Sequence, residues 1–144
     1  MGEKVRKVIV DTYALMSKAS GEITAKANEY LNNVRIGKVK GLIHPIIVYE
    51  FLLQVVRRRI PIFTSAEEAL DFLESYFSTV KVENRLAMEA AKVRVKSEKQ
   101  LKQRRLSICD AFTIALAKSI KASIITGDKD LQAIAEQEGI KVIW

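Results

Sequence analysis

The chain has 144 residues, of which 49% are hydrophobic and 28% charged, and it carries a net charge of +7. This length predicts one domain, over residues 1–144, with enough apolar side chains for a sizeable core. The single cysteine, Cys109, excludes an internal disulfide and favours a reducing, cytoplasmic setting. The charged first residues argue against a signal peptide, and no segment approaches the roughly 20 apolar residues of a membrane span.

The positive charge makes a polyanion such as nucleic acid a natural partner. Proteins of high thermal stability also carry many Lys, Arg and Glu residues on their surfaces without binding anything. Composition alone leaves both interpretations open.

The first half of the chain alternates between strand and helix patterns. A β-branched run at residues 5–10 predicts a strand, and apolar side chains at helical spacing predict a helix over residues 22–35. A second strand is expected at 40–43, followed by a helix that begins at Pro45 and ends in three arginines at 57–59. Ser65 and Glu68 form a capping box for a helix over residues 65–77.

The second half continues the alternation. Residues 79–82 predict a third strand, after which Asn84 is expected to cap a helix that extends through Val95. A basic stretch at 99–105 is interpreted as a loop or a frayed helix end, and an alanine-rich helix follows over residues 106–120. A strand at 122–126, a helix from Asp128 to Gln137 that Gly139 ends, and a strand at 142–144 complete the chain. Short apolar strands alternating with helices are typical of a parallel sheet covered on both faces.

Two of the predicted strands end in an acidic residue. Asp11 follows the apolar residues 8–10, and Asp128 follows Thr126 and Gly127 after an apolar run. In open α/β sheets, ligands bind beyond the carboxyl ends of the strands. If these two strands are neighbours, their carboxylates converge on one edge of the sheet.

Two further acids interrupt apolar helical patterns. Glu50 is the only acid in P-I-I-V-Y-E-F-L-L, and Asp110 lies in L-S-I-C-D-A-F-T-I-A-L-A. An ionised carboxylate in apolar surroundings is unfavourable by about several kcal/mol unless a partner compensates it. A divalent cation would compensate several carboxylates at once, and oxygen-only ligation suits Mg²⁺ or Mn²⁺.

Each acid also has a purely structural interpretation. Asp110 follows Ser107 by three residues and would close a capping box, Asp128 is a good helix N-cap, and Asp11 suits a turn after a strand. Glu50 could pair with Gln54 or Arg57. Capping and metal binding are compatible, because a helix N-terminus stabilises an ionised carboxylate.

Four motifs together resemble the successive motifs of PIN-domain nucleases, and in particular the VapC-like toxin branch. They are V-I-V-D-T, Y-E-F, L-S-I-C-D-A-F-T-I-A-L-A-K and I-I-T-G-D-K-D-L. The resemblance extends over residues 8–144. It implies a three-layer α/β/α, Rossmann-like fold and hydrolysis of RNA phosphodiester bonds with Mg²⁺ or Mn²⁺. Tyr13 departs from the small polar residues common in the toxin branch, which leaves the subfamily open.

The resemblance also implies a set of site residues. The expected metal-binding and catalytic acids are Asp11, Glu50, Asp110 and Asp128. Thr126 corresponds to the family's catalytic hydroxyl beside the last acid. Thr12 occupies the position of a Ser or Thr that often follows the first acid, and Asp130 is either a further site acid or only a first-turn helix residue.

The resemblance further implies partners. A small antitoxin protein would cover the acidic site, and the chain would form a homodimer, for which Phe63, Phe72, Leu73 and Tyr76 offer an apolar contact surface. Two basic clusters could guide RNA towards the acids, cover a solvated helix face, or meet an acidic protein. They are Arg57, Arg58 and Arg59, and Lys92, Arg94, Lys96, Lys99, Lys102, Arg104 and Arg105.

Three other functions remain compatible with the sequence. The protein could be a housekeeping RNA-processing PIN nuclease, or a catalytically silent PIN scaffold that binds RNA or protein. A signalling receiver domain also has acids at strand ends, but it expects paired acids after the first strand and a phosphoacceptor Asp after the third. Here the third predicted strand is followed by Glu83 and Asn84.

Overall fold

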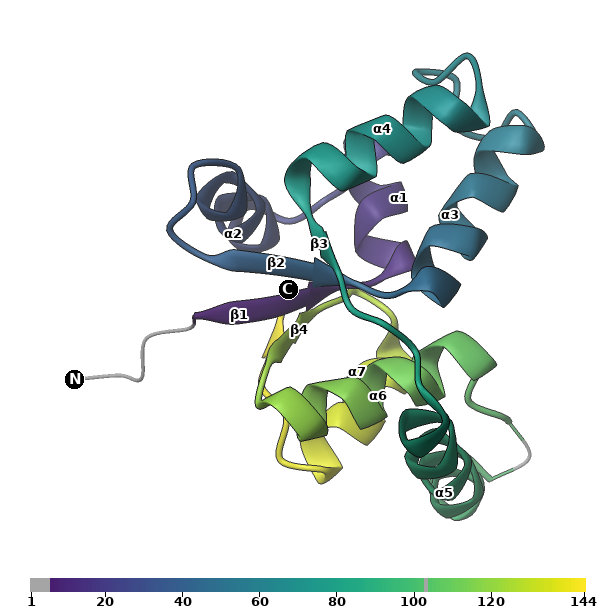
Figure 1. Ribbon diagram of the computed structural model, residues 1–144. Helices are drawn as coiled ribbons and strands as arrows, with labels where there is room; N and C mark the ends of the chain where they lie inside the picture. The colour runs from purple at the N-terminus through teal and green to yellow at the C-terminus, as the bar shows by residue number, and fades with distance from the viewer. Residues whose placement is uncertain (1–5, 103) are drawn as a thin grey trace.

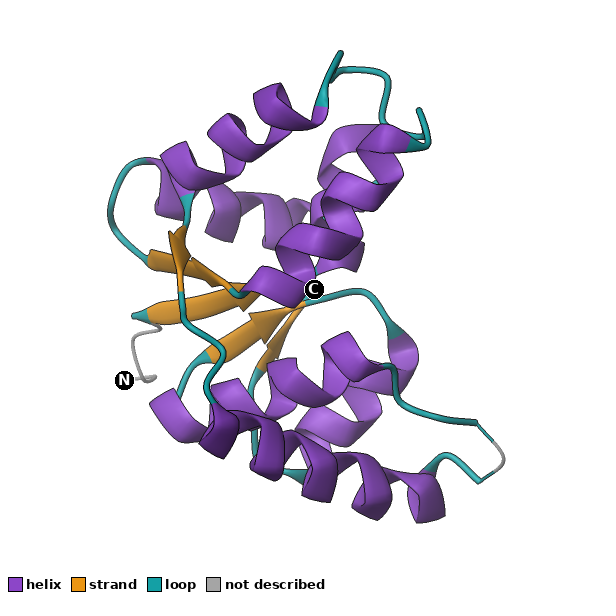
Figure 2. Ribbon diagram, turned by 45° about the vertical axis from the view of Figure 1, so that its right-hand side comes forward, coloured by secondary structure: helices purple, strands orange, loops and turns teal. Residues whose placement is uncertain are grey.

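A computed structural model of the chain describes residues 6–102 and 104–144. A parallel sheet forms its centre, with helices on both faces (Figures 1 and 2). This arrangement confirms the predicted three-layer α/β/α fold. In chain order the described elements are β1 (Lys7–Val10), α1 (Thr12–Ser20), α2 (Ala25–Arg35), β2 (Lys40–Ile43), α3 (Pro45–Val56), α4 (Ala66–Tyr76), β3 (Ser78–Thr79), α5 (Asn84–Gln100), α6 (Ile108–Ile120), β4 (Ser123–Ile125), α7 (Lys129–Gln137) and β5 (Val142–Ile143).

The strand order is β3-β2-β1-β4-β5, and every pair of neighbours is parallel. Strand β1 therefore lies in the middle, hydrogen-bonded to β2 on one side and to β4 on the other. Val10 is in register with Ile125, the last residue of β4. The carboxyl ends of β1 and β4 thus lie side by side, as the convergence of Asp11 and Asp128 required.

The helices divide between the two faces of the sheet. Helices α1 to α4 lie on one side and α5 to α7 on the other (Figure 1). The chain changes sides after β3, on its way into α5. Each face of the central strands is consequently covered, which explains why β1 reads as an almost unbroken β-branched run.

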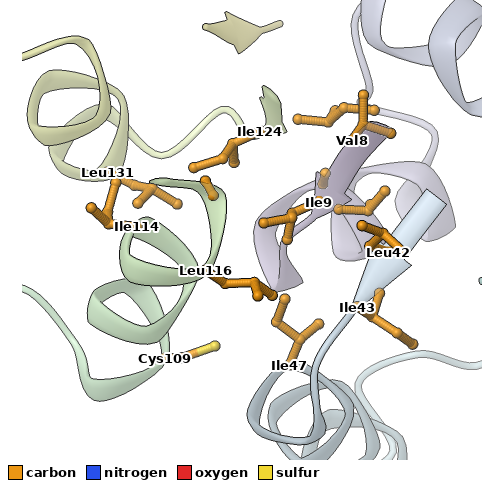
Figure 3. Packing of buried hydrophobic residues seen from close by; sticks show 14 of the residues in the cluster. Val8, Ile9, Leu42, Ile43, Ile47, Cys109, Ile114, Leu116, Ile124 and Leu131 are labelled. Atoms are coloured by element: carbon orange, nitrogen blue, oxygen red, sulfur yellow. The ribbon is translucent and has the colours of Figure 1, made fainter. Parts of the chain in front are cut away.

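The core lies between the sheet and both helical layers. Val8, Ile9 and Val10 of β1 are fully buried, and so are Ile124 and Ile125 of β4. Figure 3 shows Leu116 of α6 and Ile47 of α3 close together next to the β1 and β2 side chains, and Leu131 of α7 beside Ile114 of α6. Complete burial of a Val, Leu or Ile side chain stabilises the fold by about 1.5–3 kcal/mol. The central strands are therefore firmly held, and with them the residues that follow their carboxyl ends.

Several element boundaries differ from the predictions. Helix α1 was not predicted at all, and β3 is only Ser78–Thr79 rather than residues 79–82. Helix α5 is preceded by Glu83, with no side-chain capping bond, so Asn84 is its first residue and not its cap. The helix runs on to Gln100, because Val93 and Ser97 bury one side of its polar C-terminal half against the protein.

No helix in the described ranges combines the length and the hydrophobicity needed to cross a membrane.

Candidate active site

Asp11 stands at the carboxyl end of β1 and caps α1. Its side chain is almost completely buried, with 3% of the residue exposed. One carboxylate oxygen accepts a hydrogen bond of 2.8 Å from the backbone N–H of Ala14, and the other accepts one from the hydroxyl of Thr126. A short apolar strand ending at a helix N-terminus therefore holds this acid in a single orientation.

Asp128 stands at the corresponding end of β4 and caps α7. Its Oδ1 accepts a hydrogen bond of 2.9 Å from the backbone N–H of Leu131. The Thr126 hydroxyl oxygen also accepts a hydrogen bond of 3.1 Å from the backbone N–H of Asp128. Thr126, itself fully buried, thus connects the ends of β1 and β4.

Glu50 and Asp110 reach the same edge from helices. Glu50 lies in the middle of α3, and its Oε1 accepts a hydrogen bond of 2.8 Å from the hydroxyl of Thr12. Asp110 lies in the first turn of α6, where its backbone N–H donates to the Ser107 hydroxyl at 3.0 Å. The predicted capping of Asp110 by Ser107 is therefore present, whereas Glu50 pairs with Thr12.

The four acids line one hollow of about 610 Å³ at the carboxyl edge of the sheet. Two of the other predicted residues lie outside its lining: Thr126 is buried beneath Asp11, and Asp130 faces Arg104, whose Nη2 lies 3.3 Å from its Oδ1. The residues that line the hollow are Asp11, Thr12, Tyr13, Met16, Ser17, Ser20, Glu22, Glu50, Gln54, Ser107, Asp110 and Asp128.

Burial and neighbouring charges raise the pKa values of two of the acids, Asp11 and Asp110. Burial raises the pKa of Asp11 to about 7, and the charges of Asp110 and Asp128 add to this effect against the hydrogen bonds from Thr126 and Ala14. Burial also raises the pKa of Asp110 to about 7, with further contributions from the charges of Asp128, Glu50 and Asp130. Without a cation, two of the acids are thus close to half-protonated at neutral pH.

Comparisons with known proteins identify the family. A sequence model of the PIN domain matches residues 8–137. The chain belongs to the PIN domain family. A comparison with curated protein sequences gave no match.

Solved structures share the PIN fold at low sequence identity. Mycobacterium tuberculosis VapC20, described as a sarcin–ricin loop cleaving toxin, superposes with a TM-score of 0.65 at 17% identity, over 88% of this chain and 93% of that one. VapBC2 from Rickettsia felis, bound to a promoter DNA fragment, superposes with a TM-score of 0.69 at 13% identity, over 94% of this chain and 96% of that one. A toxin–antitoxin complex from Klebsiella pneumoniae superposes with a TM-score of 0.61 at 18% identity, over 85% of this chain and 88% of that one. Membership of this family sets aside the receiver-domain alternative.

The hollow of this PIN domain suits a hard divalent cation. Its charged ligands are all carboxylate oxygen atoms, and neither histidine nor cysteine lines it; Met16 contributes the one sulfur atom of the lining. Burial, and after it the neighbouring carboxylates, raise the pKa of Asp11 and of Asp110, so a cation in the hollow would stabilise the ionised form of both acids. Within residues 6–102 and 104–144, no group of three or more His, Cys, Asp or Glu side chains is already arranged to hold an ion. Carboxylates that repel one another would have to turn towards a common cation.

One wall of the hollow was missing from the sequence prediction because α1 was missing. Tyr13, Met16, Ser17 and Ser20 all come from this helix. The sequence carried two indications of it: an N-cap acid at Asp11, and a glycine after the last turn. Gly21 adopts the left-handed conformation, with φ 78°, that commonly ends helices.

Buried hydrogen bonds of His44 and Thr113 connect the two helices that carry Glu50 and Asp110. His44 is fully buried and caps α3 through Nδ1, which accepts from the backbone N–H of Ile47 at 3.4 Å. Its Nε2 lies 2.9 Å from the Thr113 hydroxyl, which donates to the carbonyl oxygen of Cys109 at 2.9 Å. The hydroxyl proton is thus used, so His44 Nε2–H is the donor to Thr113.

These hydrogen bonds join the start of α3 to the first turn of α6. Helix α3 carries Glu50 further along its length, and the first turn of α6 carries Asp110. Burial lowers the pKa of His44 to about 4, so the ring is neutral at physiological pH and has a structural role. Cys109 is 2% exposed and fills the role of a small buried hydrophobe. Burial and the nearby Glu50 raise the pKa of its thiol, which excludes a reactive thiolate.

Proposed function

We propose that this PIN domain is a metal-dependent endoribonuclease and the toxin of a toxin–antitoxin pair. The observation that carries the proposal is the convergence of Asp11, Glu50, Asp110 and Asp128 on one hollow at the carboxyl edge of the sheet. Four acids crowded together in a basic protein destabilise the free fold, so their arrangement favours a catalytic role over a structural one.

The four acids would hold one or two Mg²⁺ or Mn²⁺ ions. A bound divalent ion lowers the pKa of a water molecule and offsets the negative charge that develops on a phosphodiester during hydrolysis. No side chain of the hollow has to act as a nucleophile, which agrees with the inert Cys109 thiol.

The two threonines position the acids from behind. Thr12 donates to Glu50 and leaves its second carboxylate oxygen for other partners. Thr126 donates to Asp11 and accepts from the backbone of Asp128, which fixes the spacing of these two acids. We therefore assign Thr126 a positioning role, since it is buried beneath the hollow rather than part of its lining.

Similarity in fold supports the toxin assignment. One neighbour is described as an RNA-loop cleaving toxin and another as a toxin–antitoxin complex. The alternatives are an RNA-processing PIN nuclease and a silent scaffold. A short adjacent reading frame for a DNA-binding protein with a basic tail would favour the toxin, and failure to bind Mg²⁺ or Mn²⁺ would favour the scaffold.

An apolar groove offers a place for the proposed antitoxin. A hollow of about 400 Å³ between α1, α2, α3 and α4 contains a run of aromatic rings in which Phe63 and Phe72 lie 5.4 Å apart, with Lys18 and Arg35 also in its lining. An apolar helix with a few acidic residues would complement this groove. Leu73 does not contribute, because it is fully buried in the core.

The homodimer requires a different surface. Two exposed apolar residues of α3 lie outside the groove: Tyr49 and Val56, which are 63% and 65% exposed. Light scattering on the purified chain, alone and with each of these residues changed to Ser, would locate such a contact.

The decisive experiment measures cleavage of a mixed RNA pool by the purified protein with Mn²⁺. Asp110→Asn should reduce cleavage at least about a hundredfold, since it removes a ligand and a charge from the hollow. EDTA should abolish cleavage in the unchanged protein.

The matched control is Asp71→Asn, which removes the same charge from an exposed position on α4 outside the hollow. It should cleave like the unchanged protein. Equal activity of Asp110→Asn and Asp71→Asn in a folded protein would rule out the acidic hollow as the nuclease site.

A further inference from the structure

A second hollow lies at the opposite edge of the sheet from the four acids. It measures about 740 Å³ and is formed by the start of β1, the start of β4, and the turns that follow α6 and α7. We call it the amino-edge hollow. Its basic residues are Arg6, Lys7, Lys118, Lys121 and Lys141.

Among the described residues that line this hollow, Glu138 is the one with a carboxylate, and it is already neutralised. Glu138 accepts ion pairs from Lys118 at 3.0 Å and from Lys96 at 3.1 Å, and its side chain is only 9% exposed. Burial alone would raise the pKa of Glu138, but the hydrogen bonds from the two lysines outweigh it and lower that pKa. This carboxylate therefore stays ionised and paired, and has little charge to offer the other cations.

The remaining cations of the hollow have no such partner. Within the described part of the chain, all ion pairs shorter than 4.0 Å involve other basic residues: Lys92, Lys96, Arg104 and Lys118. Among the residues that the structure describes, no carboxylate therefore lies within ion-pair distance of Arg6, Lys7, Lys121 or Lys141, the four remaining positive charges of the hollow.

Two of these positive charges occupy positions that are locally unfavourable, one for its charge and one for its backbone conformation. Lys7 of β1 is in register with Lys40 of β2, so two like charges stand on neighbouring strands. Lys121 adopts a left-handed conformation with φ 55°, where the turn after α7 uses Gly139 with φ 74°. A residue other than glycine is less stable in this conformation by about 1 kcal/mol.

Helix ends account for only part of this cluster. Lys118 and Lys121 lie at the C-terminus of α6, where the helix dipole favours a cation. Lys7 and Lys141 begin or precede strands, so no helix dipole explains them.

We propose that the amino-edge hollow binds the phosphate backbone of RNA, as an anchor separate from the acidic hollow. The choice of RNA rests on the proposed function. Lysine ammonium groups recognise phosphates as point charges. The uncharged lining is small or aliphatic, with Ser123 as its one side chain that could hydrogen-bond to a base: Ala117, Ile120, Ala122, Ser123, Gly139 and Ile140. The anchor is therefore expected to be independent of sequence.

The two hollows lie at opposite ends of the short central strands. Strand β1 has four residues and spans about 13 Å at 3.3 Å per residue. RNA held at the amino edge would pass around the sheet to reach the acids. The anchor would then raise affinity for longer RNA without touching the bond that is cut.

The test measures binding of a fluorescein-labelled single-stranded RNA by anisotropy over a range of NaCl concentrations. EDTA in the buffer prevents cleavage, so the experiment does not depend on nuclease activity. The variant Lys121→Gln/Lys141→Gln is compared with Lys26→Gln/Lys81→Gln, which removes the same charge from exposed positions outside the hollow.

The first variant should weaken binding and reduce the slope of log K against log [NaCl] by about 1.4, because each phosphate contact on a single strand contributes about 0.7. The control variant should change the slope much less. Equal changes in affinity and slope for both variants would mean that only the net charge of the protein matters. No change in either variant would mean that RNA does not bind at the amino-edge hollow. Both results overturn the proposal. RNA cleavage combined with either result would leave the proposed nuclease intact and remove only the anchor.

Discussion

Thr126 is the residue on which the geometry of the acidic hollow depends most directly. It is fully buried, donates to Asp11 and accepts from the backbone N–H of Asp128. Its own carbonyl oxygen accepts a hydrogen bond of 2.8 Å from the side chain of Gln132 in α7. One small polar residue thus ties together β1, β4 and α7 at the point where two acids converge.

Replacing Thr126 by Val should keep the volume and remove the hydroxyl. The buried Asp11 carboxylate would lose one of its two donors, and the Asp128 N–H would lose an acceptor, so we expect a loss of about 1–3 kcal/mol in the free energy of unfolding. Urea denaturation measures this directly. Thr126→Ser retains the hydroxyl and should recover most of the loss; equal instability of the two variants would show that packing, not the hydrogen bonds, matters here.

The strand pattern predicted that Asp11 and Asp128 converge, and the resemblance to PIN-domain nucleases added Glu50 and Asp110 to the same site, but neither described the contacts of these acids. Asp11 and Asp128 were found because each follows an apolar strand, and Glu50 and Asp110 because each is an isolated charge in an apolar helix. The pairing of Thr12 with Glu50 joins residues 38 positions apart, and no local pattern indicates it. The same holds for the Arg104–Asp130 ion pair; Asp130 does not line the acidic hollow, although its charge contributes to the raised pKa of Asp110.

At the level of elements, α3 and α6 must hold Glu50 and Asp110 at a fixed separation. The buried link from His44 through Thr113 to the Cys109 carbonyl joins these two helices near the acids. Apolar packing alone allows helices to slide slightly, whereas a hydrogen bond between buried groups specifies one register.

Thr113→Val should break this link at nearly constant volume. It leaves the Nε2–H of His44 buried without an acceptor, at an expected loss of about 1–3 kcal/mol in unfolding free energy, and it should also weaken Mn²⁺ binding if the helices shift. Calorimetry with and without Mn²⁺ separates the two effects, and Thr113→Ser is the control. Unchanged Mn²⁺ affinity in Thr113→Val would confine the link to stability.

The junction between β4 and α7 depends on a glycine. A Cβ at Gly127 would lie 2.5 Å from atoms of both the Tyr13 ring in α1 and the Trp144 ring at the C-terminus. These two rings meet edge to face, with their centres 5.5 Å apart. Only glycine lets the chain pass beneath this aromatic pair and direct Asp128 into the acidic hollow.

Gly127→Ala should therefore destabilise the protein by about 1–3 kcal/mol through overpacking. The double variant Gly127→Ala/Trp144→Ala removes one of the obstructing rings, so the two changes should cost less together than the sum of their separate effects. A double-mutant cycle from chemical denaturation measures this coupling. Strict additivity would mean that the backbone moves away and the rings are not the constraint.

Prediction at the level of elements succeeded where apolar periodicity was strong and failed where it was weak. The central strands and α3, α6 and α7 were located to within a few residues, because their apolar patterns are regular. Helix α1 was missed because its apolar pattern is weak and it follows directly after β1; α7 has the same nine residues but a clearer apolar face. Strand β3 has only two exposed residues, so its position is set by pairing with β2 rather than by its own sequence.

Over the whole molecule, charge is arranged along the direction of the strands. The four converging acids lie at the carboxyl edge, and the uncompensated lysines lie at the amino edge. This polarity follows from topology, since a fully parallel sheet brings all strand starts to one edge and all strand ends to the other. Individual residue spacings predicted the acidic edge, but the basic edge became visible only once the strand order was known.

The acidic edge should make the metal-free protein less stable as pH rises. The pKa of Asp110 is raised from 3.8 to about 7 in the folded state, so between these values the folded protein holds a proton that the unfolded chain has released. The free energy of unfolding therefore falls as pH rises from about 4 to about 7 and levels off above that. Asn does not titrate, so the stability of Asp110→Asn relative to the unchanged protein should grow over the same window, reaching about 1–3 kcal/mol at pH 8.

His44 contributes to the pH dependence in the opposite direction, but it is present in both proteins. Its contribution therefore cancels when the unfolding free energy of the unchanged protein is subtracted from that of Asp110→Asn. The pKa of His44 is lowered to about 4, so its neutral form stabilises the fold above its unfolded pKa and that stability is lost as pH falls towards 4. Urea denaturation in EDTA from pH 4 to pH 8 gives the difference directly. Mn²⁺ at pH 8 should reverse the order, because it stabilises only the protein that binds it. If Asp110→Asn is no more stable than the unchanged protein at pH 8 in EDTA, the acids are not under electrostatic strain. The crowding argument for their catalytic role would then lose its support.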